Sequence, residues 1–254
     1  TGSGLVSVTI SSPVSPQITT IDSSSRDYRF TGNGGIAGAG RLVKTGASTA
    51  TLETENTFVG GTTVTGGILR VGNGGAAGSL TGSVAIEAGG TLEFNRSGSL
   101  AVAGVLSGDG ALVKNGTGLV TLDGSHTFSG TVQVNAGSLA LTPFDHAGGM
   151  TVANGAALVA ISGVEPATLS TASLALGGTG STLAFEMASS SNPTVPLLAV
   201  TQADGLALSG GNHSIAVSTS GALQPGRFTL LDYTGSSISS GFTLAALPPR
   251  VNAS

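Results

Sequence analysis

Three histidines, His126, His146 and His213, are the side chains of this sequence best suited to proton transfer near neutral pH. A serine nucleophile would need one of them within hydrogen-bond reach, and the Gly-x-Ser-x-Gly segment that often holds such a serine does not occur. The chain also has no cysteine, which excludes thiolate nucleophiles and disulfides. We therefore expect no hydrolase triad, and we expect the histidines to lie at the surface or at corners of the fold.

Carboxylates could cleave glycosidic bonds if two of them came within about 5 to 9.5 Å of each other. Glu53 and Glu55 lie two residues apart, and Glu87 and Glu93 flank a Gly-Gly turn. Solvated, outward-facing side chains explain both pairs more simply than catalysis does. We expect no catalytic residue, no metal ion and no cofactor.

Lys44 and Lys114 each lie two residues before a glycine, Gly46 and Gly116. Such a lysine could hold an anionic ligand, but a lone cation is a weak indication of a site. The simpler prediction is that each ammonium hydrogen-bonds carbonyl groups of a neighbouring segment or stays solvated. The Gly72–Ala77 segment resembles a nucleotide or calcium loop only in part, and we predict a corner there.

The composition restricts the fold class. Of 254 residues, 42 are glycine and only 9% are charged, with 9 Lys and Arg against 13 Asp and Glu. So much glycine disfavours helices, while 39% hydrophobic residues are enough to form a core and argue against disorder. Nucleic acid is excluded as a partner because no basic cluster is present.

An internal repeat organises the first part of the chain. Residues 38–71 and 108–141 align without a gap at an offset of 70, with 14 identities in 34 positions. Within each copy, short segments alternate apolar and polar residues, as strands do when one face is buried. If the copies stacked in register, Glu53 and Asp123 would lie three rungs apart, about 14 Å at the usual strand spacing.

Short strands in units of about 18 to 24 residues cannot bury an apolar face alone, but a stack of them can. The sequence therefore predicts an all-β fold, a right-handed parallel β-helix in which each rung is one revolution of the chain. Prolines are absent between Pro16 and Pro143 and frequent later. We predict regular rungs over residues 1–161 and a less regular C-terminal cap over 162–254, with residues 166–176 either strand or a short helix.

The two copies resemble the passenger-associated transport repeat of bacterial autotransporters, proteins of type V secretion. His126 departs from that pattern, which has Asn there, and Phe58 and Phe128 replace Tyr. The residues that carry the resemblance are Gly40, Leu42, Lys44, Gly46, Leu52, Phe58, Gly110, Leu112, Lys114, Gly116, Leu122 and Phe128.

The C-terminal quarter of the chain resembles the C-terminal passenger segment of this family, the autochaperone, on the segments 206–211, 223–233 and 242–249. The resemblance implies that this segment folds first outside the cell and nucleates folding of the rest. The residues expected to form that folding nucleus are Leu206, Leu208, Ile215, Val217, Phe228, Leu230, Tyr233, Phe242 and Leu244.

The resemblance further implies a stalk at the surface of, or secreted from, a Gram-negative bacterium. Its expected partners are its own C-terminal outer-membrane barrel, which this sequence does not include, and the barrel-assembly machinery. Two alternatives stay open: an adhesin surface that binds a host protein, and a carbohydrate-active β-helix. With only 10 aromatic residues, the sequence offers little for a large apolar or sugar-stacking patch.

Overall fold

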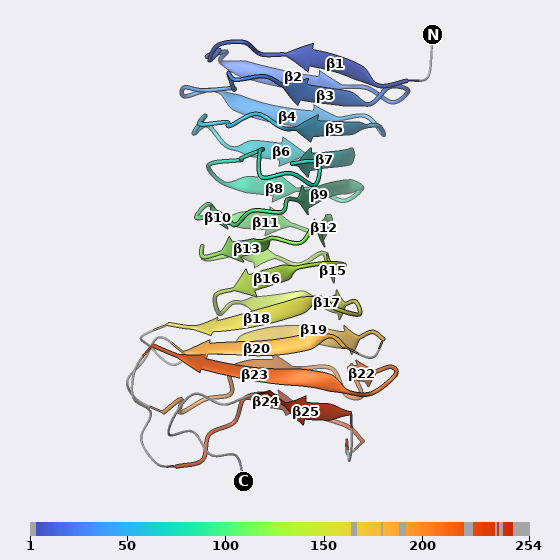
Figure 1. The fold of residues 1–254 in the computed structure, drawn as a ribbon, viewed down its shortest axis with the longest axis vertical. Helices are drawn as coiled ribbons and strands as arrows, with labels where there is room; N and C mark the ends of the chain where they lie inside the picture. Colours follow the sequence, from blue (N-terminus) through green and yellow to red (C-terminus); the bar gives the residue numbers. More distant parts are fainter. Residues whose placement is uncertain are drawn as a thin grey trace. The chain divides into compact units, whose positions relative to one another are not determined.

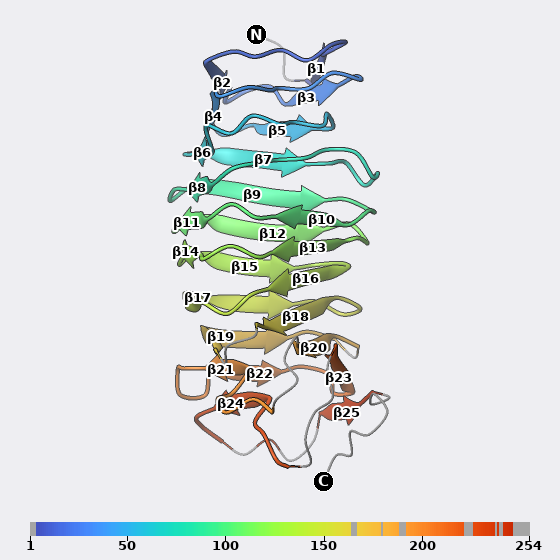
Figure 2. The same cartoon turned by 90° about the vertical axis from the view of Figure 1, so that its left-hand side faces the viewer.

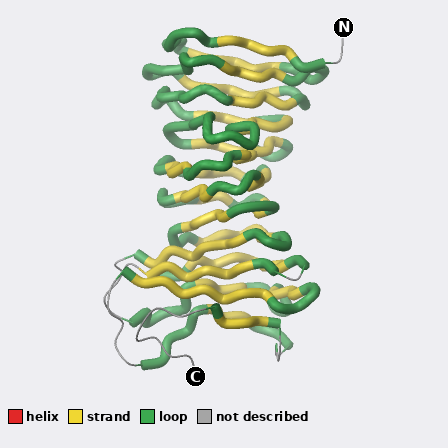
Figure 3. The backbone as a smooth tube through the Cα atoms, in the orientation of Figure 1, coloured by secondary structure: helices red, strands yellow, loops and turns green. Residues whose placement is uncertain are grey.

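The computed structural model describes residues 4–163, 167–178, 180–187, 192–220, 226–236, 238 and 241–245. All regular structure in these ranges is β-strand, as Figure 3 shows in yellow. No helix long and apolar enough to cross a membrane occurs among these residues. The chain divides into two compact units, unit 1 (Thr1–Thr131) and unit 2 (Val132–Ser254).

Unit 1 contains short strands that follow one another in the stack shown in Figure 1. Their bounds are β1 (Val6–Thr9), β2 (Ile18–Asp22), β3 (Tyr28–Thr31), β4 (Arg41–Thr45), β5 (Thr49–Leu52), β6 (Thr62–Val64), β7 (Gly67–Val71), β8 (Val84–Ile86), β9 (Gly90–Asn95), β10 (Leu100–Val102), β11 (Leu106–Gly108), β12 (Ala111–Asn115), β13 (Leu119–Leu122) and β14 (Thr127–Phe128).

The strands of unit 1 form three ladders of parallel strands, which we call faces 1, 2 and 3. Face 1 is β1-β3-β5-β7-β9-β12, face 2 is β2-β4-β6-β8-β11-β14, and face 3 is β10-β13. Figure 2 shows β7, β9 and β12 directly above one another. Because neighbours in a ladder belong to successive revolutions of the chain, unit 1 is a parallel β-solenoid.

Alternation along each strand places the apolar side chains inside. In face 1, Ala50, Leu69, Leu92 and Leu112 are in register with one another, and each is at most 1% exposed. Burying a leucine side chain contributes about 1.5 to 3 kcal/mol. Such columns stabilise the solenoid, and each rung depends on its neighbours for burial.

The two repeat copies begin on different faces, which the sequence did not predict. Strand pairing takes Leu42 through Thr62 and Val84 to Leu106, so Leu106 lies three revolutions beyond Leu42. The repeat counterpart of Leu42 is instead Leu112, on the strand that follows Leu106 in the chain. As a result, β4 lies in face 2 while its counterpart β12 lies in face 1. Likewise β5 lies in face 1 and its counterpart β13 in face 3.

Unit 2 continues with longer strands. Their bounds are β15 (Thr131–Val134), β16 (Ser138–Leu141), β17 (Asp145–Val152), β18 (Ala157–Ser162), β19 (Leu169–Leu176), β20 (Thr182–Met187), β21 (Leu198–Val200), β22 (Leu206–Leu208), β23 (His213–Thr219), β24 (Leu231–Tyr233) and β25 (Phe242–Leu244).

Two parallel ladders run through unit 2. One is β15-β17-β19-β21-β24, with β22 also paired to β19, and the other is β16-β18-β20-β23-β25. Leu174 and Leu176 of β19 and Leu183 and Phe185 of β20 are at most 1% exposed. The possible helix at residues 166–176 is a strand where the structure describes it, because its alternate residues enter the core.

The prediction of an all-β, parallel β-helical fold is confirmed in both units. The predicted boundary at 161/162 was drawn from proline placement, and it stays a prediction about the texture of the chain. The contact-based boundary lies at 131/132.

Candidate functional site: buried polar groups of the repeat

Lys44 lies inside the solenoid, although it is a charged residue. It occupies an inward position of β4, in register with Ile21 and Val64, and is 1% exposed. Its ammonium donates hydrogen bonds to the carbonyls of Thr45 at 2.9 Å, Gly46 at 2.8 Å and Gly66 at 2.9 Å. All three N–H donors are thus satisfied by carbonyl groups at a corner, as a buried ammonium requires.

Lys114 repeats this arrangement on face 1. It is fully buried, in register with Phe94, and donates to the carbonyls of Asn115 and Gly116 at 2.8 Å each. Burial lowers the pKa of Lys114 to about 8. Burial also lowers the pKa of Lys44, which Asp22 and Asp27 oppose. Of the alternatives predicted for these lysines, hydrogen bonding to corner carbonyls is the one observed.

The glycine two residues after each lysine shapes the corner. Gly46 and Gly116 both have a φ of +72°, a conformation that strains residues with a side chain. A Cβ at Gly46 would also meet the backbone of Ser23. The Lys-x-Gly spacing therefore joins a carbonyl-binding cation to the turn whose carbonyls it binds.

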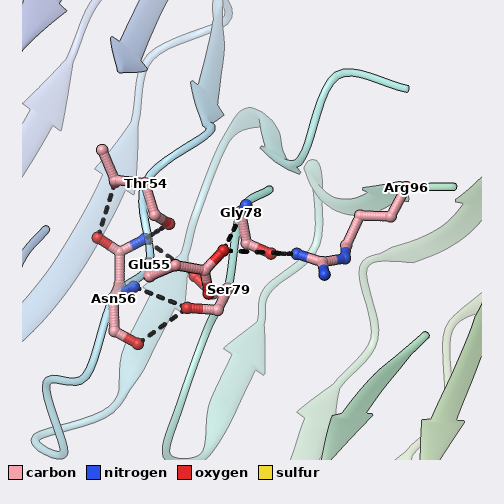
Figure 4. Close-up of polar contacts among 6 residues, drawn as sticks. All are labelled: Thr54, Glu55, Asn56, Gly78, Ser79 and Arg96. Atoms are coloured by element: carbon pink, nitrogen blue, oxygen red, sulfur yellow. Dashed lines mark hydrogen bonds and ion pairs between the residues drawn. The ribbon is translucent and has the colours of Figure 1, made fainter. Parts of the chain in front are cut away.

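A second buried polar cluster surrounds Asn56, which is 0% exposed (Figure 4). Its Oδ1 accepts hydrogen bonds from Ile36 N and Thr54 Oγ1, both at 3.0 Å. Its Nδ2 donates to the carbonyls of Thr54 and Ser79 at 2.9 Å, and its backbone N–H donates to Ser79 Oγ at 2.7 Å. Asn56 thereby links segments one revolution before it and one revolution after it.

The exposed corner at residues 73–77 is anchored next to this cluster. Glu55 Oε1 accepts a hydrogen bond from Gly78 N at 3.1 Å, and Arg96 donates to the Gly78 carbonyl (Figure 4). Arg96 Nη1 also lies 4.0 Å from Glu55 Oε1. The predicted corner at Gly72–Ala77 is therefore present, with its base fixed by an ion pair and its tip in solvent.

The histidines differ from the expectation of surface positions. His126, His146 and His213 are 6%, 2% and 0% exposed. Ser181 Oγ lies 2.6 Å from His213 Nδ1, and both side chains are 0% exposed. This pair links the start of β20 to β23 inside unit 2, where no substrate could reach it in this structure.

The candidate carboxylates bind cations and amides of neighbouring rungs. Glu53 accepts from Arg29 Nη2 at 2.8 Å, and Glu93 accepts from Asn115 Nδ2 at 2.8 Å while lying 2.9 Å from Arg70 Nε. Glu93 is only 5% exposed, so the prediction of a solvated side chain is wrong for it. The predicted stacking of Glu53 over Asp123 is also wrong, since they follow strands of faces 1 and 3.

The other residues of the repeat signature form core or close contacts. The six apolar members, Leu42, Leu52, Phe58, Leu112, Leu122 and Phe128, are at most 2% exposed. A Cβ at Gly40 would meet the Pro16 carbonyl, and one at Gly110 would meet the carbonyl groups of Glu87 and Gly90. A shallow depression lies beside Gly110, lined by Gly90, Thr91, Asp109 and Gly130.

The predicted nucleus residues lie on strands β22 to β25 and in the segment before β24. Val217 is 7% exposed and Leu244 is 45% exposed. The remaining seven are half-buried: Leu206, Leu208, Ile215, Phe228, Leu230, Tyr233 and Phe242. This part of unit 2 is less well covered than β19 and β20. Positions 223–225 and 246–249 of the autochaperone-like segments lie outside the described residues.

The comparisons with known proteins agree with the geometry of the repeat. The family model of the passenger-associated transport repeat matches residues 42–71 and 112–141, inside the two predicted copies. The Adhesin BmaC autotransporter of Brucella suis biovar 1 (strain 1330) is 37% identical over 127 residues. The chain is part of an autotransporter passenger domain. The match covers 42% of this passenger segment and 4% of that relative, and no solved structure matches.

The sequence predicted the lysines and glycines of this passenger segment but missed the partners of Asn56. Ser79 lies outside any repeated motif, and its contact with Asn56 depends on the length of the corner between them. Arg96 gave no signal either, because a single arginine near glycines is common in corners. Among the described residues, no group of three or more potential metal ligands is found.

Proposed function

We propose that this passenger segment is a β-helical stalk whose C-terminal strands nucleate folding outside the cell and so drive its own secretion. The observation that carries the proposal is the order of the ladders. In unit 1, face 2 runs β2-β4-β6-β8-β11-β14, and every neighbour in it belongs to the adjacent revolution. A rung can therefore form as soon as its one neighbour exists, without waiting for distant chain segments.

Sequential rung formation supplies a direction. Each segment that emerges can pair with an exposed strand edge and gains backbone hydrogen bonds and apolar burial together. A folded rung cannot return through a narrow pore, so each addition retains the segment outside. The partners in this process are the protein's own C-terminal outer-membrane barrel and the barrel-assembly machinery, at the surface of a Gram-negative bacterium.

Refolding kinetics of two matched variants test the nucleus. Val217 of β23 and Val64 of β6 are both buried valines paired within a parallel ladder. Truncation to alanine should cost about 2 kcal/mol in each case. If the C-terminal strands nucleate folding, Val217→Ala slows refolding, while Val64→Ala leaves refolding unchanged and accelerates unfolding. The opposite assignment of the two effects would place the nucleus in unit 1 and reject the proposal.

Adhesion is the second candidate, because the matched relative is named as an adhesin. In this case, the exposed flank of the stalk binds a host surface protein. Beads coated with the passenger segment should then bind to cultured host cells in larger numbers than beads coated with an unrelated protein of equal size. Equal binding would leave the stalk as a scaffold alone.

A further inference from the structure

His126 and Asn56 occupy equivalent positions of the two repeat copies and perform the same structural task. Asn56 Oδ1 accepts a hydrogen bond at 3.0 Å from the backbone N–H of Ile36, twenty residues earlier. His126 Nδ1 accepts one at 3.1 Å from the backbone N–H of Leu106, also twenty residues earlier. Both side chains are buried, so each fixes the amide of the preceding rung away from water.

The two acceptors differ in their response to acid. An amide oxygen stays an acceptor at any physiological pH, whereas an imidazole nitrogen accepts only in the neutral ring. Because Leu106 N–H is the donor, His126 must carry its proton on Nε2. A second proton would go to Nδ1 and place two donors against each other, which breaks this hydrogen bond.

The surroundings of His126 oppose protonation. Burial lowers the pKa of the imidazole below its ordinary value of 6.5, and this effect outweighs the hydrogen bond with the Leu122 backbone and the charge of Asp123. Asp123, directly after β13, is the ionisable group of unit 1 that acts on the ring, and it is exposed. The β11 and β14 residues in register beside His126, Ser107, Gly108, Thr127 and Phe128, carry no charge.

We propose that His126 makes the second transport repeat an acid-sensitive joint of the solenoid, in which protonation at Nδ1 releases the Leu106 amide and weakens the pairing of β14 with β11. As pH falls below 6.5, the unfolded or locally opened rung takes up a proton before the closed rung does. The closed rung therefore loses stability progressively, down to the lowered pKa of His126. The first copy, with Asn56, lacks this dependence.

Amide hydrogen exchange of the intact chain tests the joint with an internal control. After correction for the intrinsic pH dependence of exchange, the protection of the Leu106 amide should fall about tenfold between about pH 7 and about pH 5, the worth of one lost hydrogen bond. The Ile36 amide, which is bound to Asn56, should keep its protection over the same range.

The variant His126→Asn installs the acceptor of the first copy and should make Leu106 protection independent of pH while the other two histidines remain. A protonation shift of His126 in its own NMR titration, centred below 6.5, should accompany the loss in the parent chain. Constant Leu106 protection in the parent chain would overturn the proposal. So would an equal acid loss in His126→Asn, since that would assign the effect to another group.

Discussion

At the scale of single residues, the transport repeat places a lysine where an apolar side chain would ordinarily lie. Lys44 shares a column with Ile21 and Val64, and its ammonium lies among three corner carbonyls. A parallel solenoid must end each strand at a corner, where carbonyl groups lose their ladder partners. The aliphatic stem of lysine fills the core while its head satisfies these carbonyls.

Replacement of Lys44 by methionine should therefore destabilise unit 1. Methionine keeps the stem but leaves the carbonyls of Thr45, Gly46 and Gly66 without this donor, at a cost of about 2 to 3 kcal/mol. Guanidinium unfolding measures the loss. Arg41→Met in the same strand is the matched control, because Arg41 is exposed and should change stability by less than about 0.5 kcal/mol. Equal stability of Lys44→Met and the parent chain would show that water satisfies the carbonyls instead.

The buried ammonium of Lys114 should give the passenger a stability that rises in alkali. The folded chain releases this proton near its pKa of about 8, while the unfolded chain keeps it up to 10.5. Between these values the unfolded state binds more protons, so the free energy of unfolding increases with pH. Unfolding of the parent chain and of Lys114→Met at about pH 7 and about pH 10 should show the rise only in the parent. Parallel pH profiles would contradict a desolvated charge.

At the scale of elements, the corner after β4 depends on a backbone conformation that only glycine adopts easily. Gly46 has a φ of +72°, and the space for a Cβ is occupied by the Ser23 backbone. Strand and corner residues were therefore predictable, since alternation and Lys-x-Gly spacing are visible in the sequence. The rotation of the second copy by one face was not predictable, because it follows from corner lengths that only strand register reveals.

Gly46→Ala should consequently cost more than an ordinary glycine substitution, about 2 kcal/mol or more, from strain at positive φ and from contact with Ser23. Gly75→Ala is the control, since Gly75 has open space around the added Cβ and no positive φ. Thermal unfolding of both variants separates the two cases. A Gly46→Ala protein that melts with the parent would mean that this corner relaxes without loss.

At the scale of the whole molecule, stability rests on apolar columns and backbone ladders, since charged residues are only 9% of the chain. Burial is unequal within unit 2. Leu174 of β19 and Phe185 of β20 are at most 1% exposed, while Leu206 and Tyr233 are half-buried and Leu244 is 45% exposed. Resemblance to the family indicated where folding begins but gave no information on this gradient, which depends on how closely successive strands cover one another.

Hydrogen exchange in unit 2 should follow this gradient. Peptides from β18 to β20 should stay protected longest, and peptides from β22, β24 and β25 should exchange earlier through local opening. Mass spectrometry of the native chain at neutral pH provides the measurement. Uniform protection across these strands would indicate that unit 2 opens only as a whole.

The offset between the repeat copies exceeds three whole revolutions, and this excess couples the length of a passenger to its bearing. Each added copy contributes three revolutions and shifts every motif position round to the next face, as β4 and β12 already differ. Two relatives that differ by one copy would thus aim the same recognition loop in different directions around the long axis. About three copies would restore the original direction, because the solenoid has three faces. Gain or loss of a repeat would therefore reorient surface loops without altering their sequence.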